Sequence, residues 1–443
     1  MSLWTPHSWR DRPILQQPSY PDADALKRAT DTLALRPPLV TSGEIDTLRA
    51  ELAAAARGEC FVLQGGDCAE SFDECRGDII ANRLRVLLQM SLVLTHGLKQ
   101  RVVRIGRFAG QYAKPRSADT ETRDGVELPS FRGDLVNAPE FTAEARTPQP
   151  QRLLEGHALA ALSLNHVRAL IDGGFADLHH PENWDLAWMQ HTPHAQAYAR
   201  LVAEIENAVG YFETLSGQRL AHLDRIQLFS SHEALVMEYE AALTHAVGPD
   251  HYNLGCHMPW IGMRTAQPDG AHVEYCRGIA NPVGVKLGPG LSTDDVLRLL
   301  SLLDPQRTPG RLVLIHRFGH ARIEDELPGL IEAVAASGHP ALWLCDPMHG
   351  NTQTTGDGLK TRDFAHVLGE LLAAFRVHRQ LGSRLGGVHL ELTGENVTEC
   401  TGGARALSAE DLKQRYRSQV DPRLNGEQAL ELAMAIATAA SDA

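Results

Sequence analysis

The stretch ALWLCDPMHG at residues 341–350 begins as a short apolar run and ends in a loop that carries a histidine. FVLQGGDC at residues 61–68 is built in the same way and ends in a cysteine, while VHLELTG at residues 388–394 carries a glutamate. Short apolar runs of this kind are typical of strands in a parallel sheet that is covered on both faces. A (β/α)8 barrel keeps its chemistry where its strands end, so a thiol, an imidazole and a carboxylate at separate strand ends favour that fold.

Eight runs rich in β-forming residues recur along the chain from residue 61 onward. They are Phe61–Leu63, Val102–Ile105, Ile226–Phe229, Met258–Ile261, Val283–Leu287, Leu312–Ile315, Ala341–Leu344 and Val388–Leu392. Between most of them apolar residues are spaced three and four apart, which is typical of amphipathic helices. Strands that alternate with helices predict a parallel sheet, and eight such units favour a closed α/β TIM barrel. No GxGxxG motif follows the first strand, which disfavours an open dinucleotide-binding sheet.

Two segments extend beyond a bare barrel. Residues 1–55 carry several prolines and then a helix-like run, and we expect this N-terminal extension to lie at the periphery of the barrel. The gap between the second and third predicted strands is too long for one crossover. Within it, apolar residues from Tyr198 to Leu215 repeat at helical spacing, so we expect inserted accessory helices, a hairpin at residues 181–223. We expect residues 1–443 to form a single barrel domain around these additions.

Composition excludes several classes of protein. The chain has 443 residues, 43% of them hydrophobic, and a formal net charge of -13, which argues against a nucleic-acid binder. No apolar stretch is long enough for a membrane span, and residues 1–21 do not form a signal peptide, so we expect a cytoplasmic protein. The seven cysteines include no CxxC pair, which fits a reducing compartment in which thiols fill the core or bind ligands.

The side chains at the strand ends could form a mixed metal site. A thiolate from Cys68, an imidazole from His349 and a carboxylate from Glu391 would suit a first-row divalent ion. Each has a simpler interpretation: the cysteine could be a buried small side chain, and the histidine could bond to backbone. Asp421 precedes the final helix and could be a fourth ligand, although its own sequence context favours a turn.

Basic residues recur at the same strand ends. In an acidic protein this recurrence argues that they converge on one pocket, since isolated buried cations would be costly. Arginine and lysine that converge are suited to phosphate and carboxylate groups. The residues concerned are Arg107, Lys114, Arg116, Arg264, Lys286 and Arg317.

Ordered motifs along nearly the whole chain resemble one known family, the type II 3-deoxy-D-arabino-heptulosonate 7-phosphate (DAHP) synthases. These motifs are WTPHSWRDRPILQQPSYP at residues 4–21, GGDCAE at 65–70, GRFAGQYAKPRS at 106–117, SSHEAL at 230–235, NPVGVKLGP at 281–289, CDPMHGNT at 345–352 and TGENVTEC at 393–400. The resemblance implies a (β/α)8 barrel with an N-terminal extension and extra helices. Chance agreement over so many motifs in order is negligible.

The resemblance also assigns roles to residues. It implies that Cys68, His349, Glu391 and Asp421 bind a divalent metal, Mn2+ or Co2+ before Zn2+, so the turn interpretation of Asp421 gives way. The family's phosphoenolpyruvate contacts fall on Arg107, Arg264, Lys286 and Arg317, with a backbone contact at Met263. Its erythrose 4-phosphate side falls on the segment Lys114 to Ser117, including Arg116. Lys114 is the candidate for proton transfer, and Cys68 and His349 serve catalysis through the metal.

The reaction that the resemblance implies is a metal-dependent, aldol-like condensation that opens the shikimate pathway to chorismate and the aromatic amino acids. Phosphoenolpyruvate, erythrose 4-phosphate and water would give DAHP and phosphate, which makes the protein a transferase.

One position departs from the family, because Met263 stands where a glutamate is usual. Another acid such as Glu233 could contribute instead, or the enzyme could belong to secondary metabolism and use an amino analogue of the aldehyde. A third hypothesis is a catalytically weak regulatory subunit, against which the complete set of ligand positions counts. The family further implies a homodimer or homotetramer, with aromatic amino-acid effectors and a chorismate mutase partner as further expectations.

Overall fold

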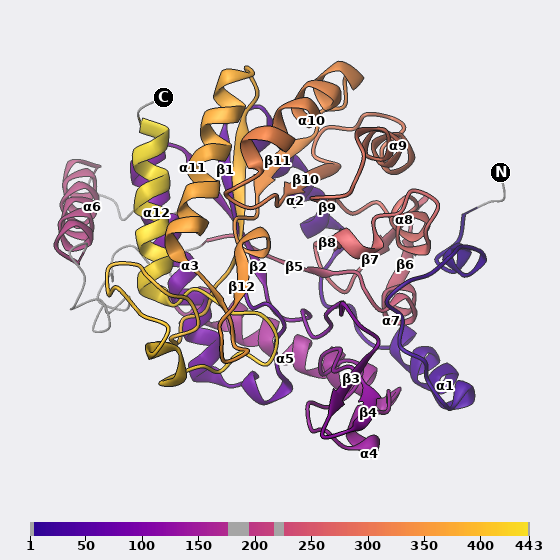
Figure 1. Cartoon of the computed structure of the whole chain (residues 1–443). Coiled ribbons are helices and arrows are strands. Elements are labelled where there is room, and N and C mark those ends of the chain that lie inside the picture. Colours follow the sequence, from indigo (N-terminus) through magenta and orange to yellow (C-terminus); the bar gives the residue numbers. More distant parts are fainter. Residues whose placement is uncertain (1–3, 176–194, 217–225, 442–443) are drawn as a thin grey trace.

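A closed barrel of eight parallel strands forms the centre of the molecule (Figure 1). The computed structural model describes residues 4–175, 195–216 and 226–441. Around the ring the strands follow sequence order, with β1 closing against β14. They are β1 (Cys60–Gly66), β2 (Arg101–Arg107), β5 (Leu228–Glu233), β8 (Met258–Ile261), β9 (Val283–Leu287), β10 (Leu312–His316), β11 (Leu342–Cys345) and β14 (Leu385–Glu391). The predicted (β/α)8 fold is therefore confirmed.

The third barrel strand lies later in the chain than its apolar run indicated. We predicted Ile226–Phe229, but β5 begins at Leu228 and continues to Glu233. Its polar second half pairs with β8, Ser231 opposite Met258 and Glu233 opposite Trp260. Backbone pairing thus overrides the polar composition of the SSHE segment, and it carries Glu233 to the end of the barrel where the other strands end.

Helices surround the barrel and connect its strands (Figure 1). The helices that lie between strands or follow the last strand are α3 (Gly77–Leu98), α7 (Met237–Ala242), α8 (Ala271–Cys276), α9 (Thr293–Leu303), α10 (Ile323–Ser337), α11 (Phe364–Gln380) and α12 (Gly426–Ser441). Their buried faces pack on the outside of the strands. In α9, for example, Val296, Leu299, Leu300 and Leu303 are buried at the predicted helical spacing. Among the described residues, no helix is both long and apolar enough to cross a membrane.

The N-terminal extension does more than cover the periphery. It contains η1 (Ser8–Asp11), α1 (Ala23–Ala34) and α2 (Ser42–Ala56). Leu48 and Leu52 of α2 join the apolar cluster inside the barrel, which includes Val62 and Leu344. The capping box of Thr41 and Glu44 fixes the start of α2. This helix therefore closes the amino-terminal end of the barrel, in contrast to the predicted peripheral position, because its leucines complete the barrel core.

The insertion between the second and third barrel strands contains strands as well as helices. After β2 come the hairpin β3 (Thr120–Arg123) and β4 (Val126–Pro129), and then α4 (Ala143–Arg146), α5 (Gln151–Asp172) and α6 (Ala195–Ser216). Helix α6 lies at the edge of the molecule and contacts α3 (Figure 1). The rest of the predicted hairpin, residues 181–194 and 217–223, lies outside the described residues. The predicted domain boundaries stay predictions.

Two further hairpins decorate the barrel. Strands β6 (Thr244–Val247) and β7 (Asp250–Asn253) pair after α7. Strands β12 (Thr352–Thr354) and β13 (Lys360–Arg362) pair after β11. The second hairpin follows the loop with His349, and it brings Lys360 and Arg362 toward the carboxyl ends of the barrel strands.

Candidate active site

A cavity of about 180 Å³ opens at the carboxyl ends of the barrel strands. Most of the residues that the sequence predicted for the site line this cavity, as do several that it did not. Its lining includes Cys68, Arg107, Lys114, Glu233, Trp260, Met263, Arg264, Lys286, Arg317, His349, Lys360, His389, Glu391 and Asp421. Residues far apart in the chain thus meet in one place, as expected for the catalytic end of such a barrel.

The four predicted metal donors are brought together. Donor atoms of Cys68, Glu391 and Asp421 all lie within 4.8 Å of one another. The Nε2 atom of His349 is 2.9 Å from Oε1 of Glu391. Sulfur, imidazole nitrogen and carboxylate oxygen are donors that suit first-row divalent ions such as Mn2+, Co2+ and Zn2+. The residues present therefore fit a divalent metal ion.

A cation already bridges part of this donor set. The ammonium group of Lys114 bonds to both Sγ of Cys68 and Oδ2 of Asp421. Burial, with Glu391 nearby, raises the pKa of the Cys68 thiol to about 12. Although burial alone would raise the pKa of Asp421, Lys114 lowers it far below its ordinary value. The positive charge of Lys114 thus stabilises the anionic forms of a buried thiol and a buried carboxylate. A metal ion bound between the same two groups would stabilise them in the same way.

Glu391 is fully buried and yet held as a carboxylate. Its Oε1 accepts a hydrogen bond from Arg107 at 3.1 Å, and its Oε2 accepts one from Arg362 at 2.7 Å. Burial alone would raise the pKa of Glu391, but His349 and these arginines hold it well below its ordinary value. Opposite charges and hydrogen bonds together keep the donor anionic.

The imidazole of His349 is oriented by a second carboxylate. Its Nδ1 lies 2.7 Å from Oδ2 of Asp346, which also bonds to the ammonium group of Lys286. Asp346 comes directly after β11, and its Oδ1 accepts from the backbone N–H groups of Met348 and His349. A ligand histidine held in this way presents its other nitrogen in a fixed direction, here toward Glu391.

Four cationic side chains surround the rest of the cavity. Arg107, Arg264, Lys286 and Arg317 line it, as predicted from the strand ends. Burial, together with Arg107 and Arg317, lowers the pKa of Lys286 to about 8 in spite of the attraction of Asp346. The Nε atom of Arg317 is buried and has no hydrogen-bond partner among the described residues. Burying several cations close together costs free energy, and an anionic ligand would offset this cost. The arrangement therefore indicates a pocket that binds anionic groups.

Trp260 and His389 hold Arg107 against the wall of the cavity. The guanidinium carbon of Arg107 lies 5.2 Å from the centroid of the Trp260 ring. Its Nη1 lies 2.7 Å from Nε2 of His389, whose Nδ1 is 2.7 Å from Oε1 of Gln64. Burial, with Lys286 and Arg107, lowers the pKa of His389 well below its ordinary value. The neutral imidazole therefore donates to Gln64 and accepts from Arg107.

Glu233 contributes a carboxyl group to this cationic cavity. Its Oε1 is buried and has no hydrogen-bond partner among the described residues. Burial raises its pKa, although Lys114 and Lys286 oppose the shift. Met263, which lies in the short helix Met263–Thr265, lines the same cavity. The site thus has one carboxyl group free for a reacting molecule, and it comes from β5 rather than from position 263.

Arg116 and Ser117 lie beside the cavity and are not part of its lining. The guanidinium of Arg116 pairs with Glu121 of the β3–β4 hairpin at 3.1 Å. Ser117 accepts a hydrogen bond from Arg264 at 2.8 Å. Of the predicted KPRS segment, Lys114 and Pro115 therefore reach the cavity, while Ser117 supports one of its arginines.

Buried ion pairs behind the cavity fix two of the donors. Arg423 donates to Asp67 at 2.7 Å and to Glu399 at 2.9 Å. Asp67 precedes Cys68, and Arg423 follows Asp421 by two residues, so this pair joins the two donor loops. The sequence analysis did not predict this ion pair. The charged residues that flank both donors, Asp67 and Arg423, could have indicated it.

Comparison with known proteins shows similarity to one family along nearly the whole chain. The profile of the class-II DAHP synthetase family matches residues 4–437. A phospho-2-dehydro-3-deoxyheptonate aldolase of Streptomyces coelicolor is 48% identical over 433 residues, which cover 97% of this chain and 96% of that protein. A protein of the same name from Neurospora crassa is 46% identical over 452 residues, covering 98% of this chain and 94% of that protein.

Proposed function

This chain belongs to the class-II DAHP synthetase family and is an enzyme, and we propose that it condenses phosphoenolpyruvate with erythrose 4-phosphate. In this reaction water is consumed, and DAHP and inorganic phosphate are released, as the first step of the shikimate pathway. The observation that carries the proposal is the shared cavity. Its lining combines metal-competent donors with cations suited to phosphate and carboxylate.

The proposed metal ligands are Cys68, His349, Glu391 and Asp421. When bound there, a divalent ion, Mn2+ or Co2+ before Zn2+, would supply a Lewis acid for the aldehyde oxygen of erythrose 4-phosphate. Support comes from the convergence of the four donors and from the ammonium group that bridges two of them. Asp346 would keep His349 in its orientation.

The proposed role of Arg107, Arg264, Lys286 and Arg317 is to bind the phosphate and carboxylate of phosphoenolpyruvate. Held by both groups, the molecule would present C3 to the aldehyde carbon, which is catalysis by positioning and preorganised charge. Cation–π contact with Trp260 and the bond to His389 would keep Arg107 in place. Lys114, Arg116 and Ser117 would serve the erythrose 4-phosphate side, the last through Arg264.

Two of the proton transfers in the reaction are assigned here to side chains of the cavity. When C3 attacks the aldehyde, the carbonyl oxygen takes a proton, and we assign its donation to Lys114. Asp421 and Cys68 raise the pKa of Lys114 even though burial would lower it, so the group is charged and can donate. Water then adds at C2 and loses one proton, for which Glu233, buried in the cavity with a free oxygen, is our candidate acceptor. The C2–O bond to phosphate breaks as the new C2 hydroxyl becomes the ketone, and the hydroxyl proton leaves with the phosphate.

Glu233 offers an explanation of how the site tolerates Met263. A carboxyl group remains in the cavity, supplied by β5, while Met263 keeps a backbone that could still contact phosphoenolpyruvate. A location in the cytoplasm, expected from the sequence composition, remains a proposal. So do a homodimer or homotetramer, aromatic amino-acid effectors and a chorismate mutase partner, which come from the family resemblance.

The direct test is product identification. Metal-stripped protein is reconstituted with Mn2+ and incubated with phosphoenolpyruvate and either erythrose 4-phosphate or its amino analogue. We expect the seven-carbon sugar acid phosphate, identified by mass, from erythrose 4-phosphate. Product from the amino analogue alone would support the secondary-metabolic alternative, and no product with either would contradict the proposed enzyme and favour the regulatory one.

A further inference from the structure

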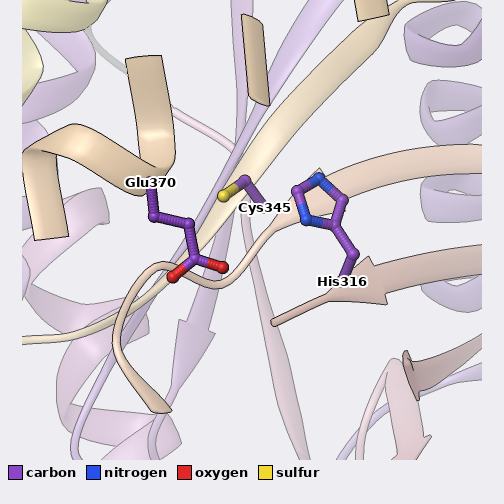
Figure 2. Close-up of side chains that lie close together, drawn as sticks. All are labelled: His316, Cys345 and Glu370. Carbon is purple, nitrogen blue, oxygen red and sulfur yellow. The ribbon is translucent and has the colours of Figure 1, made fainter. Parts of the chain in front are cut away.

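A second group of metal-competent side chains lies outside the cavity, between the barrel and its helices. His316 ends β10, Cys345 ends β11, and Glu370 projects from α11 (Figure 2). One donor atom from each lies within 4.8 Å of the other two. All three residues are completely buried. None of them belongs to the proposed reaction or to the lining of the catalytic cavity.

His316 is the observation that points to a ligand. Neither ring nitrogen has a hydrogen-bond partner among the described residues, although the residue is 0% exposed. Its ring neighbours are aromatic, with the ring of Phe318 stacked at 6.3 Å and that of His378 at 5.7 Å. A buried imidazole that forms no hydrogen bond loses the full solvation of both nitrogens. A metal ion bound to one of them would remove part of that cost.

The other two residues complete a charge-balanced site. In its anionic form Glu370 uses Oε1 to accept from the backbone of Phe318 and Gly319, and Oε2 to accept from Asn351. One acceptor position remains on Oε2. Burial raises the pKa of Glu370 to about 8 and that of Cys345 well above its ordinary value. A thiolate and a carboxylate would together neutralise a divalent ion.

We infer that His316, Cys345 and Glu370 bind a structural divalent ion of borderline softness, Zn2+ or Co2+. A thiolate ligand disfavours Mg2+ and Ca2+, which prefer oxygen. With bonds of about 2.0–2.3 Å, the donors of a tetrahedral site lie about 3.3–3.6 Å apart. Since the donor atoms lie within 4.8 Å of one another, the three side chains need to close by at most about 1.5 Å around the ion.

The position of this site suggests what the ion does. His316 is followed by Arg317, which lines the catalytic cavity, and Cys345 is followed by Asp346, which bonds to His349. Glu370 already holds the backbone after Arg317 and the side chain of Asn351. An ion shared by these three residues would brace the ends of β10 and β11 from behind, without contact with substrate.

Cobalt spectroscopy can separate this site from the catalytic one. Cys68→Ser removes the thiol of the catalytic cavity, so any thiolate-to-cobalt charge-transfer band in that variant comes from another cysteine. The full-length variant is produced in cobalt-supplemented medium, which allows the buried site to fill during folding, and it is then passed through EDTA. We expect about one Co2+ per chain and a clear thiolate band.

The ligand assignment is tested in the same background. Adding Cys345→Ser should abolish the band and reduce bound Co2+ by about tenfold or more. Adding Cys276→Ser, which alters another fully buried cysteine, should leave both unchanged. If Cys345→Ser fails to fold by circular dichroism, His316→Gln must lower the Co2+ content instead. Any one of three results overturns the inference. The Cys68→Ser protein shows no thiolate band, the band survives Cys345→Ser, or the Co2+ content survives His316→Gln.

Discussion

Lys286 should take up a proton when phosphoenolpyruvate binds near pH 8. The side chain is fully buried, and burial, together with Arg107 and Arg317, lowers its pKa to about 8 from an ordinary value near 10.4. Asp346 attracts its charge but also bonds to His349, so this attraction only partly offsets burial. Because the pKa is lowered, the ammonium form predominates below pH 8 and is lost as the pH rises through 8.

The size of the effect follows from that pKa. About 90% of the molecules carry the ammonium group at pH 7 and about 10% at pH 9, so affinity for the anion should fall roughly tenfold between them. An anionic ligand stabilises the charged form and raises the pKa of Lys286. At pH 8, where about half the molecules are neutral, binding should therefore take up about 0.5 proton.

Isothermal titration calorimetry measures this uptake directly. Metal-stripped protein is titrated with phosphoenolpyruvate at pH 8 in buffers of different ionisation enthalpy. Lys286→Arg keeps the charge at every pH and should bind with almost no uptake, while Lys286→Met should bind weakly throughout. Glu233→Gln serves as the control for another cavity group whose pKa is shifted, and it should keep the uptake. No uptake by the unaltered protein, or equal uptake by Lys286→Arg, would refute the reasoning.

Three other substitutions test separate parts of the site. Cys68→Ser should abolish turnover with Mn2+ while the melting temperature changes little, because the thiol is a proposed metal ligand and packs only in a small cluster with Phe131 and Val420; full activity in metal-free buffer would contradict that assignment. Glu233→Gln should lower kcat by about 10²–10⁴-fold with little change in the Kd for phosphoenolpyruvate, since it removes a proton acceptor; a kcat within twofold of the unaltered enzyme would exclude the role. Arg423→Met should lower the free energy of unfolding by about 3–5 kcal/mol in urea denaturation, because the buried Glu399 loses its cationic partner and Asp67 keeps only Arg83; a change below about 1 kcal/mol would show that these pairs are not needed for stability.

Much of the barrel could be predicted because its strands are short apolar runs separated by amphipathic helices. All eight predicted runs correspond to barrel strands. The exception in position, β5, has a polar second half that pairs with β8, and composition carries no signal for that pairing. The role of α2 was missed for a similar reason. Its apolar face fits any buried helix, and only the closed barrel provides the opening that Leu48 and Leu52 fill.

Some residues of the candidate site could likewise be predicted from the sequence, and others could not. Residues in the loops that follow strands, such as His349 after β11 and Arg317 after β10, could be predicted because a barrel brings strand ends together. Asp421 could not be placed from its own context, since its position depends on the long-range pair between Arg423 and Asp67. Lys360 was missed because a hairpin, rather than a barrel strand, carries it to the cavity.

The most direct test of the proposed function asks whether the chemical step requires the metal while phosphoenolpyruvate binding does not. A single preparation of the enzyme is stripped with EDTA, and both phosphoenolpyruvate affinity and phosphate release with erythrose 4-phosphate are measured before and after addition of Mn2+. We predict that the stripped enzyme binds phosphoenolpyruvate through its arginines and Lys286, releases no phosphate, and regains turnover with about one Mn2+ at the Cys68 site. Phosphate release at the full rate from stripped enzyme would contradict it.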